Sequence, residues 1–309
     1  MEIMVQTGGL MRAVGYEKGS QMLRDAGFTG VDWNIDGLVD RKVLERGELD
    51  RYHLYFKSTQ EILDALSPMY EPMLKHGLHI NQAHAPFPPY LPSVPELYDY
   101  AVEMYVNMMP FCQEVGIKNL VLHGISWNQG DPRQPSHQDN WDLNVKMYEA
   151  LIPQLVKGEM KVCLENLFYR YNGRAMEGIC SNLQEAQSMV DHLNAKAGKD
   201  VFGFCVDTGH LNLLGKSQSQ FIGGMGKRVS CLHIHDNDGR DDEHLCPYTG
   251  NIDWDDFVVG LRQAQYRGDI CFETFRQVMP ERVSPAVVPA WLRCIHDIGE
   301  TFRDKVLAE

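Results

Sequence analysis

The chain has 309 residues, which at about 150 residues per domain leaves open two small domains or one barrel of about 250 residues or more. Hydrophobic residues make up 44% and charged residues 23% of the sequence, which excludes disordered, collagen-like and membrane proteins and is typical of a globular protein with a substantial core. The 42 acidic residues outnumber the 29 basic ones, giving a net charge of −13. Because this charge repels polyanions, nucleic acid is not the expected partner.

The cysteines and the apolar runs bear on the location of the protein. The 8 cysteines are spread widely and form no CxxC pair, so they match neither a disulfide framework nor a thiolate zinc site. The first residues lack the pattern of a secretory signal, and no run approaches the ~18 apolar residues of a membrane span. We therefore expect a cytoplasmic protein with reduced thiols and no membrane contact.

Short apolar runs alternate with longer amphipathic segments along the whole chain. The predicted strands are residues 2–6, 30–35, 79–84, 119–124, 161–167, 201–207, 229–235 and 269–275. The predicted helices are residues 16–26, 58–76, 93–115, 140–157, 183–197, 215–226, 253–267 and 286–304, with Ser58, Asn182 and Asp253 as N-caps. Eight alternations without a linker predict an α/β fold, a single-domain (β/α)8 TIM barrel over residues 1–309.

Three charged or polar segments do not fit the alternation. Residues 36–57, 168–182 and 236–252 are expected to be loop insertions into the barrel. The structural alternative is an open doubly wound sheet, but no GxGxxG follows the first strand, so the sequence favours the barrel.

Ionisable side chains stand at the ends of the predicted strands, where the active site of a barrel lies. They are Asp32 with Asn34, His84, His123, Glu165, Asp207 with His210, His233 with His235, and Glu273. Buried charges without partners are costly, and a shared cation removes that cost. A cysteine stands two residues before each of Glu165, Asp207, His233 and Glu273, at Cys163, Cys205, Cys231 and Cys271. Because strand side chains alternate, we expect all eight side chains to point into the barrel.

Three carboxylates and one imidazole favour one hard or borderline divalent ion, Mn²⁺ first, with Mg²⁺, Co²⁺ or Zn²⁺ as alternatives. Such an ion polarises a carbonyl and a neighbouring hydroxyl and acidifies the hydrogen on the carbon between them. Glu165 and Glu273 are the predicted catalytic acid and base, on opposite sides of a bound sugar. This chemistry predicts a sugar isomerase or epimerase.

Several motifs in the second half of the chain carry a family resemblance. They are LVLHG (120–124), CLENL (163–167), VDTGHL (206–211), LHIHDND (232–238), DEHLCPYTGNIDW (242–254) and CFETF (271–275). With them the chain resembles the xylose isomerase-like TIM barrel superfamily, which includes sugar and sugar-phosphate isomerases and epimerases and the zinc-dependent apurinic endonucleases. The resemblance implies that the metal ligands are Glu165, Asp207, His233 and Glu273.

The resemblance also leaves more than one function open. In the endonucleases, the positions matching His84, His123, His210, Asp242 and His244 complete a three-zinc cluster, and this chain has a suitable side chain at each. A trinuclear zinc phosphodiesterase of the endonuclease IV type is therefore one alternative. The net charge of −13 and the mixed charges of residues 36–57 favour a sugar isomerase or epimerase that works through a metal-stabilised enediolate. A metal-dependent lyase or dehydratase of a keto-polyol is also compatible with the motifs, as is an inactive barrel that only binds.

Further residues are candidates for binding a small sugar or polyol substrate. They are His84, His123, His210, His235, Arg240, Asp242, His244 and Trp127. Asp236 is predicted to orient His233 or His235. Arg170, Arg174, Arg240 and Arg276 are candidates for an anion clamp, but the absence of a Gly-rich phosphate cradle favours an unphosphorylated substrate. Relatives of this kind are often dimers or tetramers, which leaves a homo-oligomer open.

Overall fold

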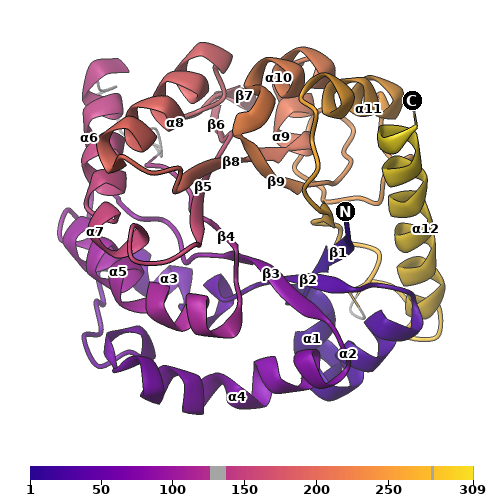
Figure 1. Ribbon diagram of the computed structural model, residues 1–309, viewed down its shortest axis with the longest axis horizontal. Helices are drawn as coiled ribbons and strands as arrows, with labels where there is room; N and C mark the ends of the chain where they lie inside the picture. Colours follow the sequence, from indigo (N-terminus) through magenta and orange to yellow (C-terminus); the bar gives the residue numbers. More distant parts are fainter. Residues whose placement is uncertain (126–136, 280–281, 309) are drawn as a thin grey trace.

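The computed structural model describes residues 1–125, 137–279 and 282–308. Eight parallel strands surround a central axis and helices cover them from outside (Figure 1). The strands are β1 (Ile3–Gln6), β2 (Gly30–Trp33), β3 (His79–His84), β4 (Asn119–Val121), β5 (Lys161–Glu165), β8 (Phe202–Asp207), β9 (Val229–His233) and β10 (Ile270–Phe272), in the order β10-β1-β2-β3-β4-β5-β8-β9. The prediction of a (β/α)8 barrel is confirmed.

The residues after β9 close the barrel against β10. A parallel bridge joins Ile234 to Phe272, and the Ile234 amide donates to the Cys271 carbonyl at 3.0 Å. The Glu273 amide donates to the Ile234 carbonyl, also at 3.0 Å. Pairing therefore runs past the end of β9 and brings His235 and Glu273 to the same rim.

The helix layer agrees with most of the predicted segments. Its longer helices are α2 (Tyr16–Asp25), α4 (Thr59–Lys75), α5 (Leu97–Val115), α6 (His137–Glu149), α8 (Leu183–Ala197), α10 (Gln218–Met225), α11 (Trp254–Gln263) and α12 (Val288–Leu307). The predicted caps Ser58, Asn182 and Asp253 all accept backbone amides at helix starts. The predicted helix 140–157 is wrong in one respect: the helix ends at Glu149, and a separate helix, α7 (Ile152–Leu155), follows with Pro153 in its first turn. Within the described chain, no helix is long and apolar enough to cross a membrane.

The expected insertions contain more regular structure than loops. Residues 36–57 hold the 3-10 turns η1 (Asp36–Leu38) and η2 (Leu54–Phe56) and the helix α3 (Arg41–Glu45). Residues 168–182 begin with an antiparallel hairpin, β6 (Phe168–Tyr171) and β7 (Arg174–Glu177). Its two turn residues, Asn172 and Gly173, have φ of 48° and 74°. Asn-Gly at such a turn is the strongest short-range hairpin signal, so the local sequence favours this hairpin.

Small side chains fill the barrel interior beneath the rim. Cys163, Cys205, Cys231 and Val121 form a buried cluster separate from the main hydrophobic core, and Cys271 is buried as well. All eight cysteines are free thiols, and seven of them are buried. Neighbouring strands are staggered. In the register of β8 with β9, Asp207 pairs with His233, whereas in the register of β5 with β8, Glu165 pairs with Cys205. The interior cysteines therefore provide packing below the rim.

The segment after β9 is fixed by one buried carboxylate. The side chain of Asp236 accepts the amides of Gly250 at 3.0 Å and Ile252 at 3.2 Å, and the Trp254 indole N–H at 3.2 Å. A Cβ at Gly250 would collide with Asp236 Oδ1 and with the neighbouring backbone, so the close approach requires glycine. Asp236 therefore ties the loop to α11, and in the described chain it contacts neither His233 nor His235 through its carboxylate, contrary to the prediction.

Replacing this carboxylate should destabilise the protein. In Asp236→Ala the three donors lose a charged acceptor inside the protein, so we expect the free energy of unfolding to fall by about 3 kcal/mol. Denaturant unfolding measures this change. The control Asp304→Ala removes a carboxylate that is 72% exposed and should change stability by less than about 0.5 kcal/mol. Equal stability of the two variants would contradict the role assigned to Asp236.

Candidate active site

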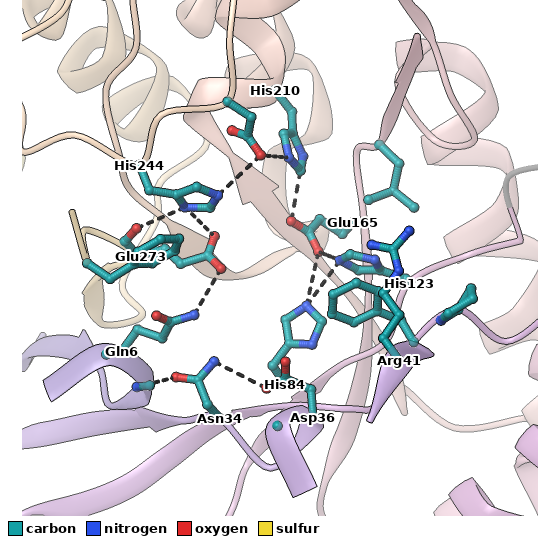
Figure 2. Close-up of a pocket in the computed structure, with 18 of the residues that line it drawn as sticks. Gln6, Asn34, Asp36, Arg41, His84, His123, Glu165, His210, His244 and Glu273 are labelled. Carbon is teal, nitrogen blue, oxygen red and sulfur yellow. Dashed lines mark hydrogen bonds and ion pairs between the residues drawn. The ribbon is translucent and has the colours of Figure 1, made fainter. Parts of the chain in front are cut away.

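A cavity of about 1030 Å³ opens at the carboxyl ends of the strands (Figure 2). Its floor is formed by ionisable groups from β3 to β10, and its walls by the loops that follow the strands. The sequence placed His84, His123, His210, Asp242 and His244 here, and all of them line the cavity together with Glu165 and Glu273. The carboxyl rim therefore gathers these groups from distant parts of the chain.

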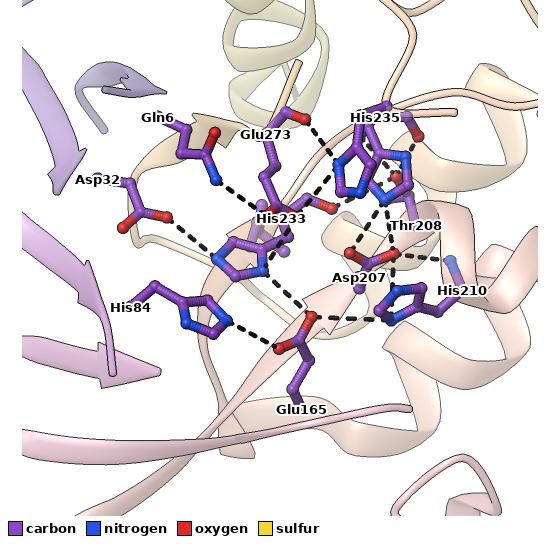
Figure 3. Close-up of polar contacts among 12 residues, drawn as sticks. Gln6, Asp32, His84, Glu165, Asp207, Thr208, His210, His233, His235 and Glu273 are labelled. Carbon is purple, nitrogen blue, oxygen red and sulfur yellow. Dashed lines mark hydrogen bonds and ion pairs between the residues drawn. The ribbon is translucent and has the colours of Figure 1, made fainter. Parts of the chain in front are cut away.

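His233 is buried beneath the cavity, whose lining does not include it, and is surrounded by carboxylates (Figure 3). Its Nδ1 is 3.2 Å from Glu165 Oε1 and 3.4 Å from Glu273 Oε2. Its Nε2 is 3.0 Å from Asp32 Oδ2, so the second ring nitrogen donates away from the cluster. Asp32 also accepts the Gln82 amide at 2.9 Å. Asp32 therefore orients His233, the role that the sequence assigned to Asp236.

Asp207 holds a second group of side chains through the motif that follows β8. It caps the short helix α9 (Thr208–Leu213), with Oδ1 accepting the His210 amide at 2.7 Å. Both of its carboxylate oxygens are also 3.0 Å from His235 Nε2. A Cβ at Gly209 would collide with the His235 ring, which explains the glycine in this motif. His235 is fully buried and lies beneath the cavity wall.

Asp242 and His244 bring the loop after β9 to the cluster. His244 Nε2 is 3.2 Å from Asp242 Oδ2, and its Nδ1 is 3.6 Å from Glu273 Oε2. The His244 ring stacks on the His235 ring with centroids 4.1 Å apart. The amide of Gln6 on β1 donates to Glu273 Oε1 at 3.1 Å. Glu273 is thereby held from one side by an amide and faces imidazoles on the other.

The donor set suits cations. Ligand atoms within 4.8 Å of one another form four groups at this rim: Glu165 with Asp207 and His233, His84 with His123 and Glu165, Asp207 with His210 and His235, and His235 with His244 and Glu273. Three buried atoms at the rim, Glu165 Oε2 and His235 Nδ1 from these groups and Asp242 Oδ1 beside them, have no hydrogen-bond partner in the described chain. Glu165 Oε2 instead lies 3.0 Å from His123 Nε2. Buried oxygen and imidazole donors with open valences fit a divalent ion.

The two candidate catalytic carboxylates differ in their electrostatic surroundings. Burial alone would raise the pKa of Glu165, but His233 and His123 hold it well below its ordinary value. Burial raises the pKa of Glu273, and the charges of His233 and His244 offset this only in part. Their environments therefore shift the two pKa values in opposite directions.

Some predicted residues lie elsewhere. Arg240 is exposed and does not line the cavity; its carbonyl accepts the guanidinium of Arg170. Trp127 lies outside the described residues. The cavity wall also includes Arg12 and Arg41, which the sequence did not single out. They stand six and eight residues beyond the ends of β1 and β2, within the helices α1 and α3, so no motif at a strand end marked them.

The fold and motifs match known proteins. Residues 21–293 match the family model for the xylose isomerase-like TIM barrel. Protein y4fM of Sinorhizobium fredii is 22% identical over 265 residues, covering 82% of this chain and 79% of the relative. A probable endonuclease 4 of Mycoplasma capricolum is 24% identical over 195 residues, covering 60% of each chain. The crystal structure of D-allulose 3-epimerase from Methylomonas sp. has a TM-score of 0.65 at 19% identity, covering 99% of this chain and 96% of that chain.

Metal binding at this site should release protons. Burial alone would lower the pKa values of His210, His233 and His244, but the neighbouring carboxylates raise them, that of His244 to about 9. Ligation requires neutral imidazole, so we expect the affinity for Mn²⁺ to rise with increasing pH, by about tenfold per pH unit for each proton released. Calorimetry in two buffers of different ionisation enthalpy measures the protons. Equal heats in both buffers and a constant affinity would contradict this expectation.

Proposed function

The chain belongs to the xylose isomerase-like TIM barrel family, and from this premise we propose that it is a divalent-metal-dependent isomerase or epimerase of a ketose or keto-sugar. The observation that carries the proposal is that two glutamates lining the cavity converge on the buried His233 beneath it. His233 Nδ1 lies 3.2 Å from Glu165 and 3.4 Å from Glu273, and Asp207 shares a ligand group with His233 and Glu165. An enzyme that moves a proton next to a carbonyl needs such an arrangement.

The residues that would hold the metal are Glu165, Asp207, His233 and Glu273. Three carboxylates with one imidazole favour Mn²⁺ or another hard to borderline ion. When bound, the ion polarises the substrate carbonyl and lowers the pKa of the adjacent C–H. The chain's own residues orient the ligands: Asp32 accepts from His233, and the His210 N–H and His235 fix the Asp207 carboxylate.

Glu165 and Glu273 are the proposed proton carriers. They lie at the ends of β5 and β10, on either side of His233, and both line the cavity. One carboxylate removes the proton from the carbon beside the carbonyl, and the other returns a proton to the opposite face for epimerisation or to the neighbouring carbon for isomerisation. Gln6 holds Glu273 Oε1, which leaves Oε2 directed at the cluster. The fold shared with D-allulose 3-epimerase supports this assignment.

Substituting these glutamates should stop proton transfer. We expect Glu165→Gln and Glu273→Gln, loaded with saturating Mn²⁺, to lose about 10²–10⁴-fold in kcat for epimerisation of a ketose panel. Exchange of substrate hydrogen with D2O, followed by NMR, measures the same step directly. Glu300→Gln, on the outer helix α12, is the control and should retain full activity. Full exchange in either active-site variant, with metal retained, would rule out the assigned roles.

A trinuclear zinc phosphodiesterase is the second candidate function. Three of the four ligand groups include histidines beyond the single-metal set, and the probable endonuclease 4 matches 60% of this chain. The same cluster is therefore compatible with more than one ion. The net charge of −13 opposes binding of a DNA backbone, which is why we place this function second.

Metal stoichiometry separates the two functions. After dialysis against a chelator and reconstitution, we expect one tightly bound divalent ion per chain and restoration of ketose epimerisation by Mn²⁺. Mass spectrometry of the purified protein for metals, together with an abasic-DNA cleavage assay, tests this. Three zinc ions per chain with cleavage of abasic DNA would establish the phosphodiesterase instead.

A further inference from the structure

The cavity extends beyond the ionisable cluster towards the loops that follow β1 and β2. Arg12, Tyr16, Asn34, Asp36 and Arg41 line this part, which we call the β1–β2 arm. Among the described residues, none of the four ligand groups at the rim includes a member of the arm. At about 1030 Å³ the cavity is at the upper end of the range for drug-sized ligands, so a substrate held at the cluster has room to reach into the arm.

Arg41 places a guanidinium close to the cluster (Figure 2). Its Cζ is 5.6 Å from the centre of the Phe87 ring, and that ring is 4.5 Å from the His123 ring. His123 in turn contacts Glu165, so one aromatic ring separates the guanidinium from a candidate ligand. The Nε of Arg41 is 2.8 Å from Glu45 on the exposed face of α3. Within the described chain its two terminal nitrogens donate to no protein acceptor, so they can bind a ligand.

Arg12 supplies a second cation to the same arm. It lies in α1 (Gly8–Val14), is exposed, and has no hydrogen bond or ion pair within the described residues. Arg170 makes the contrast clear, because it also lines the cavity but is engaged by the Arg240 carbonyl and the Asp241 carboxylate. Arg12 and Arg41 are therefore the guanidinium groups available to a ligand in the arm.

The side chains that line the arm carry more positive than negative charge. They include two guanidinium groups and one carboxylate, Asp36, which accepts the Asn34 amide at 3.2 Å, while the Nε of Arg41 also pairs with Glu45, which does not line the cavity. The other carboxylates that line the cavity, Glu165, Asp242 and Glu273, belong to the cluster. A positive region inside a chain with a net charge of −13 attracts a small anion to this point. Guanidinium matches the paired oxygens of phosphate and carboxylate.

We propose that Arg12 and Arg41 bind an anionic group at the end of the substrate remote from its carbonyl. The substrate is accordingly a ketose phosphate or a keto-sugar acid. This inference rests on the proposed function, which places the carbonyl at the cluster, and its phosphate form departs from the expectation from the sequence of an unphosphorylated substrate. Phosphate and carboxylate share the chemistry that the arm recognises, so the experiment must distinguish them.

The test compares three probe sugars that differ only at the sixth carbon. D-fructose, D-fructose 6-phosphate and D-fructuronate carry a hydroxyl, a phosphate and a carboxylate there, and their binding to the Mn²⁺-loaded protein is measured by calorimetry. We expect one of the two anionic probes to bind at least about tenfold more tightly than D-fructose. The preferred anion identifies the substrate class.

Substitutions in the arm then test whether Arg12 and Arg41 cause the preference for an anionic probe. Arg12→Met and Arg41→Met should each reduce the preference for the anionic probe by about tenfold or more and leave the affinity for D-fructose unchanged. Arg46→Met is the matched control, because it removes a cation from the end of α3 that pairs with Glu48 and does not line the cavity. It should keep the full preference.

The outcomes separate the anion site from the proposed function. Equal binding of all three probes, or a preference that survives both arm substitutions, overturns the anion site while the epimerase proposal stands. Binding of none of the three by metal-loaded protein overturns both. If Arg46→Met reduced the preference for the anionic probe as much as the arm substitutions do, the preference would reflect the overall charge of the protein. That result would also overturn the assigned site.

Discussion

The carboxylate of Glu165 is almost fully buried, since the residue is only 2% exposed, and imidazole nitrogens lie close to both of its oxygens. Burying such a charge costs several kcal/mol unless opposite charge or strong hydrogen bonds compensate it. His123 and His233 provide that compensation from the end of β4 and from β9, and His210 adds a third contact at 3.7 Å. These contacts therefore depend on the closed barrel, which brings the ends of β4, β5 and β9 and the helix α9 together at one rim.

The surroundings of the cluster restrict its motion. Below it, the interior cysteines offer no competing charge, since burial raises the pKa of Cys163, Cys205 and Cys231 well above the ordinary value. Above it, the loop that carries Asp242 and His244 is tied to α11 through Asp236. A site whose ligands are fixed by neighbours of this kind is preorganised, so little ordering remains to be done when a ligand binds.

The sequence predicted the barrel, the helix N-caps and the ionisable groups at the strand ends. Each of these depends on a local property of the chain: the alternation of strands and helices, capping residues such as Ser58, and the alternation of side chains along a strand. It did not predict which carboxylate contacts which histidine. Asp32 and His233 are 201 positions apart and meet only through closure, whereas the carboxylate of Asp236, the neighbour in sequence, binds the far end of its own loop and Trp254 of α11. Arg12 and Arg41 were not predicted for the same reason, because their position in the cavity wall depends on how α1 and α3 pack over the rim.

The β6–β7 hairpin shows how differently the loops of one barrel are built. It exposes Tyr171 and Met176, yet Phe168 at its base packs against His210 at a ring distance of 5.0 Å. The segments after β1 and β2 make no such ring contact with the histidines of the cluster within the described chain. Under the proposed function, natural variation or laboratory recombination of those two segments would alter which sugar is accepted and leave the residues proposed to hold the metal unchanged, so relatives that share every cluster residue are expected to differ in substrate.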